Sequence, residues 1–140
     1  MTDIEYLKKY LTKEKFDEGI EKLKQGIPVQ YIVGSTNFYG YEIKVNENVL
    51  IPRFETEQLI EKTINYIKEY FDKNISIVDL GTGSGCIAIT LKKKINADVT
   101  AVDISEKALN VAKENAINND VQIEFLQGDM LNPLTKNMML

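Results

Sequence analysis

The chain has 140 residues, 44% of them apolar, and a formal net charge of −4, a composition that predicts a globular domain with a modest core. The acidic balance argues against general binding to nucleic acid or anionic membranes, and no apolar run approaches the ~20 residues of a membrane span. The sequence has no histidine and one cysteine, Cys86, which excludes intrachain disulfides, His/Cys zinc sites, and Ser–His or Cys–His catalytic pairs. We therefore expect a cytoplasmic protein without a metal, whose chemistry uses a cofactor, carboxylates, amides or the backbone.

The first third of the chain predicts short helices followed by a hairpin. Apolar residues recur at helical spacing within residues 3–25, which predicts two short helices, and Gly26 and Pro28 end the second. Residues 29–51 are rich in β-forming side chains and predict a small β-hairpin with Gly40 near its turn.

The remainder of the chain alternates between helices and strands. The expected elements are a helix from about residue 55 to 71, a strand at 75–80, a helix at 84–94, a strand at 98–103, a helix at 105–118 and a strand at 121–126. This alternation predicts a parallel α/β sheet. Three parallel strands make half of a doubly wound fold, so we expect an incomplete, truncated domain whose open sheet edge invites self-association. The expected units are 1–28 (helical), 29–52 (hairpin) and 53–140 (partial α/β domain).

A glycine-rich turn joins the strand at 75–80 to the next helix. It begins at Asp79 and places glycines at Gly81, Gly83 and Gly85, where they can take positive φ and let a ligand approach the backbone. A dinucleotide fingerprint, G-x-G-x-x-G, would need its third glycine at Cys86. The D-x-G-x-G-x-G spacing resembles motif I of the S-adenosyl-L-methionine (SAM) methyltransferases instead. The alternative is a strand–turn–helix whose glycines serve tight packing alone.

An acid at the end of the following strand, Asp103, completes the pattern. A carboxylate in this place can accept hydrogen bonds from both ribose hydroxyls of a nucleoside. SAM carries no phosphate, so the acid at Asp79 is compatible with its ammonium-bearing end, whereas a phosphate would be repelled. A helix cap is the alternative role for Asp103.

Several segments in unbroken order resemble the HemK family, the protein-(glutamine-N5) methyltransferases that act on peptide-chain release factors. The matching segments are Gln30-Tyr31-Ile32-Val33-Gly34, Phe38-Tyr39-Gly40, Leu50-Ile51-Pro52-Arg53-Phe54-Glu55-Thr56-Glu57, the glycine turn, Ala101-Val102-Asp103 and Gly128-Asp129. The resemblance implies a Rossmann-like SAM-dependent methyltransferase fold and a release factor as the protein substrate. Phe54 stands where the family usually has proline.

The resemblance also implies a set of cofactor-binding residues. The glycine turn would hold the methionine end and ribose of SAM, Asp103 the ribose hydroxyls, and Ile104 the adenine face. Asp129 would accept from the adenine amino group, with Met130 beside the ring. Ordinary core packing is the alternative for Ile104, and a turn acid for Asp129. The residues of the turn in this set are Gly81, Thr82, Gly83, Ser84 and Gly85. Arg53, Glu55 and Thr56 either border the cofactor or cap the following helix.

One motif of the family is absent from this sequence. The family carries Asn-Pro-Pro-Tyr beyond the position of Asp129, and its Asn side chain and a proline carbonyl orient the target amide toward the methyl group, which is catalysis by positioning. Here Asn132-Pro133-Leu134 comes too early and lacks the second proline and the tyrosine. Catalytic residues are therefore unassigned, and we expect little or no transferase activity from this chain alone.

Three other functions remain open on sequence grounds. An adenine N6-methyltransferase acting on nucleic acid shares the Asn-Pro-Pro-Tyr chemistry, although the acidic charge and the family segments weigh against it. A SAM-binding module without catalysis fits the missing motif. An NAD-binding domain is disfavoured by the glycine spacing.

Overall fold

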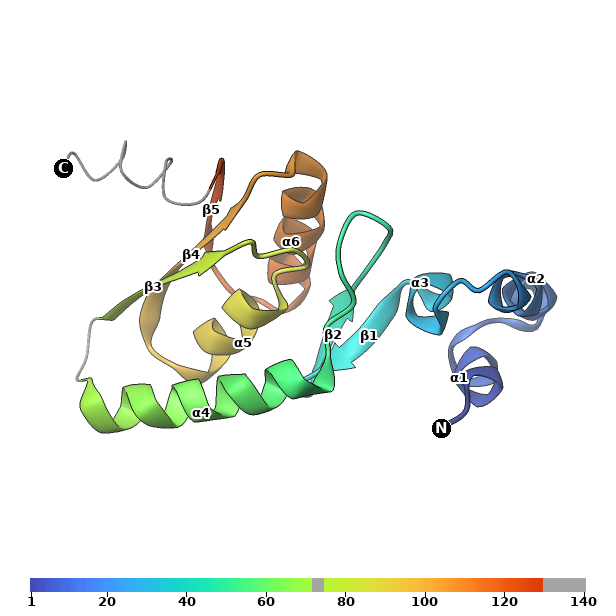
Figure 1. Ribbon diagram of the computed structural model, residues 1–140, viewed down its shortest axis with the longest axis horizontal. Coiled ribbons are helices and arrows are strands. Elements are labelled where there is room, and N and C mark those ends of the chain that lie inside the picture. Colours follow the sequence, from blue (N-terminus) through green and yellow to red (C-terminus); the bar gives the residue numbers. More distant parts are fainter. Residues whose placement is uncertain (72–74, 130–140) are drawn as a thin grey trace.

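The computed structural model describes residues 1–71 and 75–129, and Figure 1 shows their arrangement. Six helices and five strands are present in these two ranges. In chain order they are α1 (Asp3–Tyr10), α2 (Lys13–Lys24), α3 (Val29–Val33), β1 (Ser35–Phe38), β2 (Tyr41–Lys44), α4 (Phe54–Tyr70), β3 (Ile75–Leu80), α5 (Cys86–Lys94), β4 (Ala97–Asp103), α6 (Glu106–Asn118) and β5 (Glu124–Gln127).

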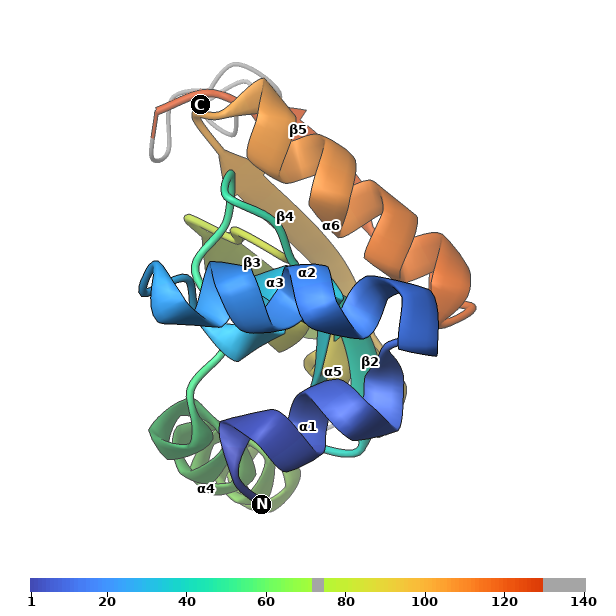
Figure 2. The same ribbon diagram turned by 90° about the vertical axis from the view of Figure 1, so that its right-hand side faces the viewer.

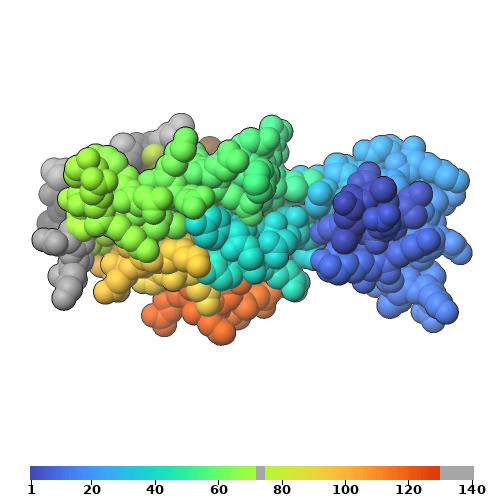
Figure 3. All heavy atoms as spheres, turned by 90° about the horizontal axis from the view of Figure 1, so that it is seen from below, coloured from blue at the N-terminus to red at the C-terminus, as the bar shows by residue number. Residues whose placement is uncertain are grey.

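The two N-terminal helices are confirmed, and α1 begins with a complete capping box. The Thr2 hydroxyl accepts from the Glu5 amide, and the Glu5 carboxylate accepts from the Thr2 amide. Helix α2 crosses close to α1 at Gly19, where an added Cβ would lie 2.7 Å from Cδ1 of Leu11. These helices form one end of the molecule, which faces the viewer in Figure 2 and is joined to the rest by a narrower region in Figure 3.

Residues 29–33, which the β-forming composition assigned to the extended segment, form the helical turn α3 instead. Pro28 precedes the turn, and Gly34 ends it at φ +91° with its amide donating to the Gln30 carbonyl. Val29 is buried where α3 packs with α1 and α2. The flanking Pro and Gly, together with this packing, override the β propensity of the valines and isoleucine.

The predicted hairpin is confirmed for β1 and β2. The strands pair antiparallel, with Phe38 opposite Tyr41 at the turn. Tyr39 and Gly40 take φ values of +55° and +88°, the conformation that a two-residue hairpin turn requires.

The three later strands form a parallel sheet in the order β3-β4-β5, as predicted. Helix α5 begins two residues later than predicted because Gly85 takes φ +84°. Strand β5 begins at Glu124 rather than at residue 121, because the amides of Asp120 and Val121 donate back to α6 and complete its C-terminus.

The two faces of this sheet differ in burial. Helices α5 and α6 pack on the face that carries Ala101 and Phe125, and α4 packs on α5. On the opposite face of β3, Val78 and Leu80 are 43% and 41% exposed. This opposite face is therefore open on β3, whereas Val102 on β4 is buried.

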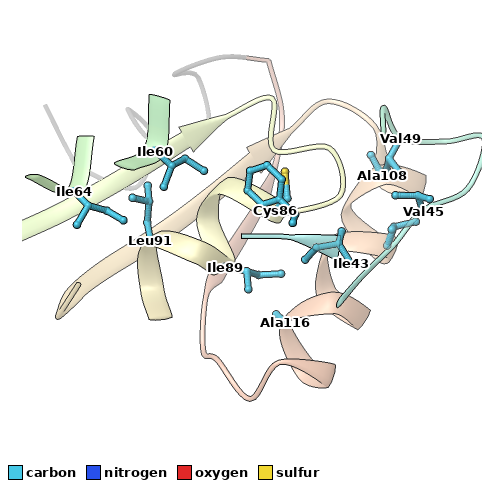
Figure 4. Packing of buried hydrophobic residues seen from close by; sticks show 12 residues of the cluster. Ile43, Val45, Val49, Ile60, Ile64, Cys86, Ile89, Leu91, Ala108 and Ala116 are labelled. Atoms are coloured by element: carbon cyan, nitrogen blue, oxygen red, sulfur yellow. The ribbon is translucent and has the colours of Figure 1, made fainter. Parts of the chain in front are cut away.

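A single apolar cluster joins the hairpin to α4, α5 and α6. Figure 4 shows Ile43 near Ile89, Val45 and Val49 near Ala108, and Ile60 and Ile64 near Leu91. The hairpin thus contributes its buried face to the core of the α/β part. No described helix is both long and apolar enough to cross a membrane.

Candidate functional site

The glycine loop, residues 81–85, is held in place by backbone hydrogen bonds. The amides of Gly81 and Thr82 both donate to the Val102 carbonyl of β4, at 2.8 and 3.0 Å, and the Gly85 amide donates to the Thr82 carbonyl at 2.9 Å. All three glycines of the loop have positive φ, between +56° and +84°, which L side chains adopt at a cost.

Asp103 lies at the end of β4 with its carboxylate facing this loop. One carboxylate oxygen accepts from the Gly83 amide at 2.9 Å and the other from the Ser105 amide at 3.0 Å. The capping residue of α6 is Ser105, whose hydroxyl accepts from the Ala108 amide at 3.1 Å. Asp103 is therefore not the helix cap: it connects the tip of β4 to the glycine loop.

A cavity of about 400 Å³ opens between the glycine loop and the segment of residues 48–53. Asp103 and Ser105 border it from β4 and the start of α6, and Thr56 from the first turn of α4. The other lining residues are Asn48, Val49, Leu50, Ile51, Pro52, Arg53, Gly81, Thr82, Gly83, Ser84, Cys86, Ile87 and Ala108. One wall is backbone-rich and polar, and the other is largely apolar.

The three loop glycines differ in the space beside them. A Cβ built on Gly81 or Gly83 would meet no atom within 4 Å, so the space beside both residues is open. Gly85 differs, since its Cβ would lie 3.0 Å from Cβ of Ala112 on α6. Two glycines therefore leave room in the cavity, and the third allows the loop to pack on a helix.

Two ionisable side chains near the loop have shifted pKa values. Burial raises the pKa of the Asp79 carboxyl above its usual 3.8, and the hydrogen bond from the Thr82 hydroxyl at 2.8 Å opposes that rise. Burial also raises the pKa of the Cys86 thiol to about 11, so the thiol is protonated at neutral pH and is a poor nucleophile. Cys86 is a small buried side chain, 8% exposed.

The structure brings most of the expected cofactor residues to this cavity. Gly81, Thr82, Gly83, Ser84 and Asp103 all line it, and Gly85 lies behind them against α6. Asp79 supports the loop from beneath through Thr82 rather than lining the cavity.

The residues expected to contact adenine lie outside the lining. Ile104 is 68% exposed, which rules out ordinary core packing for it. Asp129 is also exposed, and it follows Gly128, whose amide donates to the Asp103 carbonyl at 3.0 Å. Both therefore flank the tip of β4. Met130 falls outside the described residues.

The second wall of the cavity contains residues that sequence reasoning missed or left open. Arg53 and Thr56 line the cavity, whereas Glu55 borders a neighbouring hollow with Gln30. Asn48 and Val49 were not predicted, because nothing in their spacing indicates a ligand and only the tertiary fold brings them opposite the glycine loop.

Comparison with known proteins identifies the class of this fold. Residues 77–138 match the family described as Methyltransferase domain. The fold is similar to that of the tRNA (uracil-54, C5)-methyltransferase of Pyrococcus abyssi, solved in complex with S-adenosyl-L-homocysteine (TM-score 0.55, 22% identity, 68% of this chain and 23% of that one). The chain thus has the Rossmann-like α/β fold of the SAM-dependent methyltransferases, as predicted.

The relatives in sequence narrow the class to one family. The chain is 51% identical over 112 residues to the release factor glutamine methyltransferase of Flavobacterium psychrophilum, covering 79% of this chain and 39% of that one. It is 45% identical over 125 residues to the enzyme of the same name from Bacillus subtilis, covering 87% and 43%. These relatives confirm the resemblance to the HemK family, and the chain spans less than half their length.

Proposed function

We propose that this chain forms the cofactor-binding part of a release factor glutamine methyltransferase, and that the cavity between the glycine loop and residues 48–53 binds SAM. The observation that carries the proposal is the meeting of the open glycines, Gly81 and Gly83, with the Asp103 carboxylate at one cavity. When bound, SAM would supply the electrophilic methyl group, and a glutamine side chain of a release factor would receive it.

Asp103 is suited to holding the ribose of the cofactor. A carboxylate offers about four acceptor positions, and the amides of Gly83 and Ser105 use two of them. The remaining lone pairs can accept from two hydroxyls, while the backbone bonds keep the carboxylate from turning away. The glycine loop would then hold the ribose and the methionine end, since Gly81 and Gly83 leave that space open.

The adenine would lie beside the tip of β4. Ile104 and Asp129 are exposed on either side of this tip, next to Asp103 and Gly128 respectively. We assign Ile104 to the face of the ring and Asp129 to its amino group, and we add Met130 beside the ring on the sequence resemblance alone.

Transfer to a glutamine amide needs groups that these 140 residues lack. The amide nitrogen is a weak nucleophile, and the Asn-Pro-Pro-Tyr motif that orients it in the family is absent from the sequence. We expect the purified chain to bind SAM without methylating a release factor. In the cell we expect it in the reducing cytoplasm, the compartment that suits a single free thiol. Methylation by this chain alone would contradict this assignment of roles.

The cofactor site is tested by calorimetric titration of the purified chain with S-adenosylhomocysteine and, separately, with NAD. We expect binding of S-adenosylhomocysteine and none of NAD. Asp103→Ala should weaken binding at least ~10-fold, because hydrogen bonds to a charged group contribute about 1.5–3 kcal/mol each.

Asp98→Ala is the matched control, since Asp98 is an exposed acid on the same strand, away from the cavity lining. It should leave the affinity unchanged. Binding that survives Asp103→Ala would overturn the ribose assignment, and preference for NAD would overturn the cofactor.

A further inference from the structure

Asn115 of α6 is a fully buried polar side chain that contacts two separate parts of the chain. Its side-chain oxygen accepts from the Lys44 amide at 2.7 Å. Its side-chain nitrogen donates to the Lys44 carbonyl at 3.0 Å and to the Ser84 carbonyl at 2.9 Å. One amide group thus satisfies both backbone groups of the last residue of β2 and one carbonyl of the glycine loop.

These two contacts lead to the two walls of the cavity. Ser84 lines the cavity as part of the glycine loop. Lys44 ends β2, and the chain continues from it through buried Val45 into the 48–53 segment, which contains buried Val49. Asn115 therefore fixes both the glycine loop and the start of the chain segment that forms the opposite wall to one turn of α6.

The same helix also contacts the loop one turn earlier. Ala112 lies against Gly85 so closely that a Cβ on the glycine would be 3.0 Å from the Ala112 methyl carbon. The loop is therefore seated on α6 at Ala112 by packing and at Asn115 by a hydrogen bond, and the hairpin is attached at Asn115.

We propose that Asn115 is a positioning residue that sets the separation of the two cavity walls and thereby the affinity for the cofactor. The ligand in this proposal is the one given by the proposed function. The hydrogen bonds of Asn115 to the two walls do not depend on that function. Asparagine suits the position because it offers one acceptor and two donors to one N–H and two carbonyl groups. An apolar residue would leave these three groups unpaired in the interior, and aspartate would face two carbonyl oxygens with a carboxylate.

Asn119, the C-cap of the same helix, provides a matched control. Its side-chain nitrogen donates to the Glu42 carbonyl of β2 at 3.1 Å and to the Asn115 carbonyl at 2.9 Å. It therefore connects α6 to the same strand without contacting the glycine loop. A contact that only holds the helix to the hairpin would be weakened by substitution of either Asn115 or Asn119.

The test measures the affinity for S-adenosylhomocysteine and the thermal midpoint for Asn115→Ala, Asn115→Asp and Asn119→Ala. We expect the Asn115 variants to bind at least tenfold more weakly at a temperature where they are folded, and Asn119→Ala to bind within twofold of wild type. The backbone amide resonances of Gly83 and Gly85 should move together with those of Val49 and Leu50 in Asn115→Asp, and stay in place in Asn119→Ala.

Unchanged affinity in a folded Asn115 variant would overturn the proposal and leave Asn115 as a structural residue. If both Asn115 variants fail to fold while Asn119→Ala folds, the proposal is also overturned, because Asn115 would then serve the fold as a whole. If wild type does not bind S-adenosylhomocysteine, the proposed function fails, and the joint movement of the two sets of amide resonances still decides whether Asn115 couples the walls.

Discussion

The two walls of the cavity are built in different ways. The glycine loop is fixed by hydrogen bonds to the adjacent strand, through the carbonyl of Val102 and the carboxylate of Asp103. The 48–53 segment is fixed at its start, where Tyr31 donates to the Val49 carbonyl and the Val49 amide donates to the Asn46 carbonyl, while Leu50 is 86% exposed. One wall follows from a local sequence pattern, and the other from contacts between distant segments.

Because the two walls are built differently, we expect substitutions in one wall to change mainly stability and substitutions in the other to change mainly ligand binding. A change in the glycine loop disturbs a rigid element that packs on α6, so it should lower the stability of the fold. A change in the supports of the 48–53 segment should affect ligand binding more than folding, because Val49 is the only buried residue of that segment.

Gly85→Ala should have the largest effect on stability, about 2–4 kcal/mol in the free energy of unfolding. The substitution adds the cost of a left-handed backbone at φ +84° and a methyl group 3.0 Å from Ala112. Chemical denaturation measures the loss.

Gly26→Ala is the control for Gly85→Ala, since Gly26 has φ +86° and no atom within 4 Å of an added Cβ. It should cost only the backbone term, about 1–2 kcal/mol, and Ala112→Gly should partly rescue Gly85→Ala. Equal losses at the two glycines would mean that the contact with α6 contributes nothing.

Tyr31→Phe should have an intermediate effect, about 1 kcal/mol in stability and a measurable loss of affinity for S-adenosylhomocysteine. It removes the hydrogen bond of 2.5 Å from the Tyr31 hydroxyl to the Val49 carbonyl, which holds the second wall. Titration calorimetry compares it with Tyr6→Phe, which removes a bond of 3.0 Å to the Ser35 carbonyl far from the cavity. The comparison of the walls is wrong if both variants weaken binding equally.

Asp79→Asn should have the smallest effect and the opposite sign. Because burial raises the pKa of Asp79 in the fold, its charged form is disfavoured there, and wild-type stability falls as pH rises from 3.8 through the raised value. An amide keeps an acceptor for the Thr82 hydroxyl and carries no charge, so the variant should be more stable at neutral pH. Urea denaturation should show this advantage shrinking toward zero as pH falls below 3.8, and an advantage independent of pH would contradict burial of the Asp79 charge as its cause.

The sequence predicted what depends on local chemistry. The glycines Gly81, Gly83 and Gly85 and the acid at Asp103 belong to one strand–helix–strand unit, and their spacing in the sequence indicated that they meet at one end of the sheet. The alternation of strands and helices likewise predicted the parallel sheet.

What could not be predicted depends on distant contacts. Residues 29–33 became a helix because α1 and α2 pack against them, and Asn115 reads as a surface polar residue in the sequence although it is fully buried beneath the hairpin. Asn48 and Val49 face the glycine loop for the same reason, since the core formed by the hairpin and α6 brings them there.

Strand β3 pairs with β4 along one side and forms an edge of the sheet in the described residues, with Val78 and Leu80 exposed on one face. An unpaired strand edge beside exposed apolar side chains offers a surface to any chain with a complementary strand, including a second copy. A partner that binds this edge of the folded chain would stabilise it, so we expect the midpoint of unfolding to rise with the concentration of that partner.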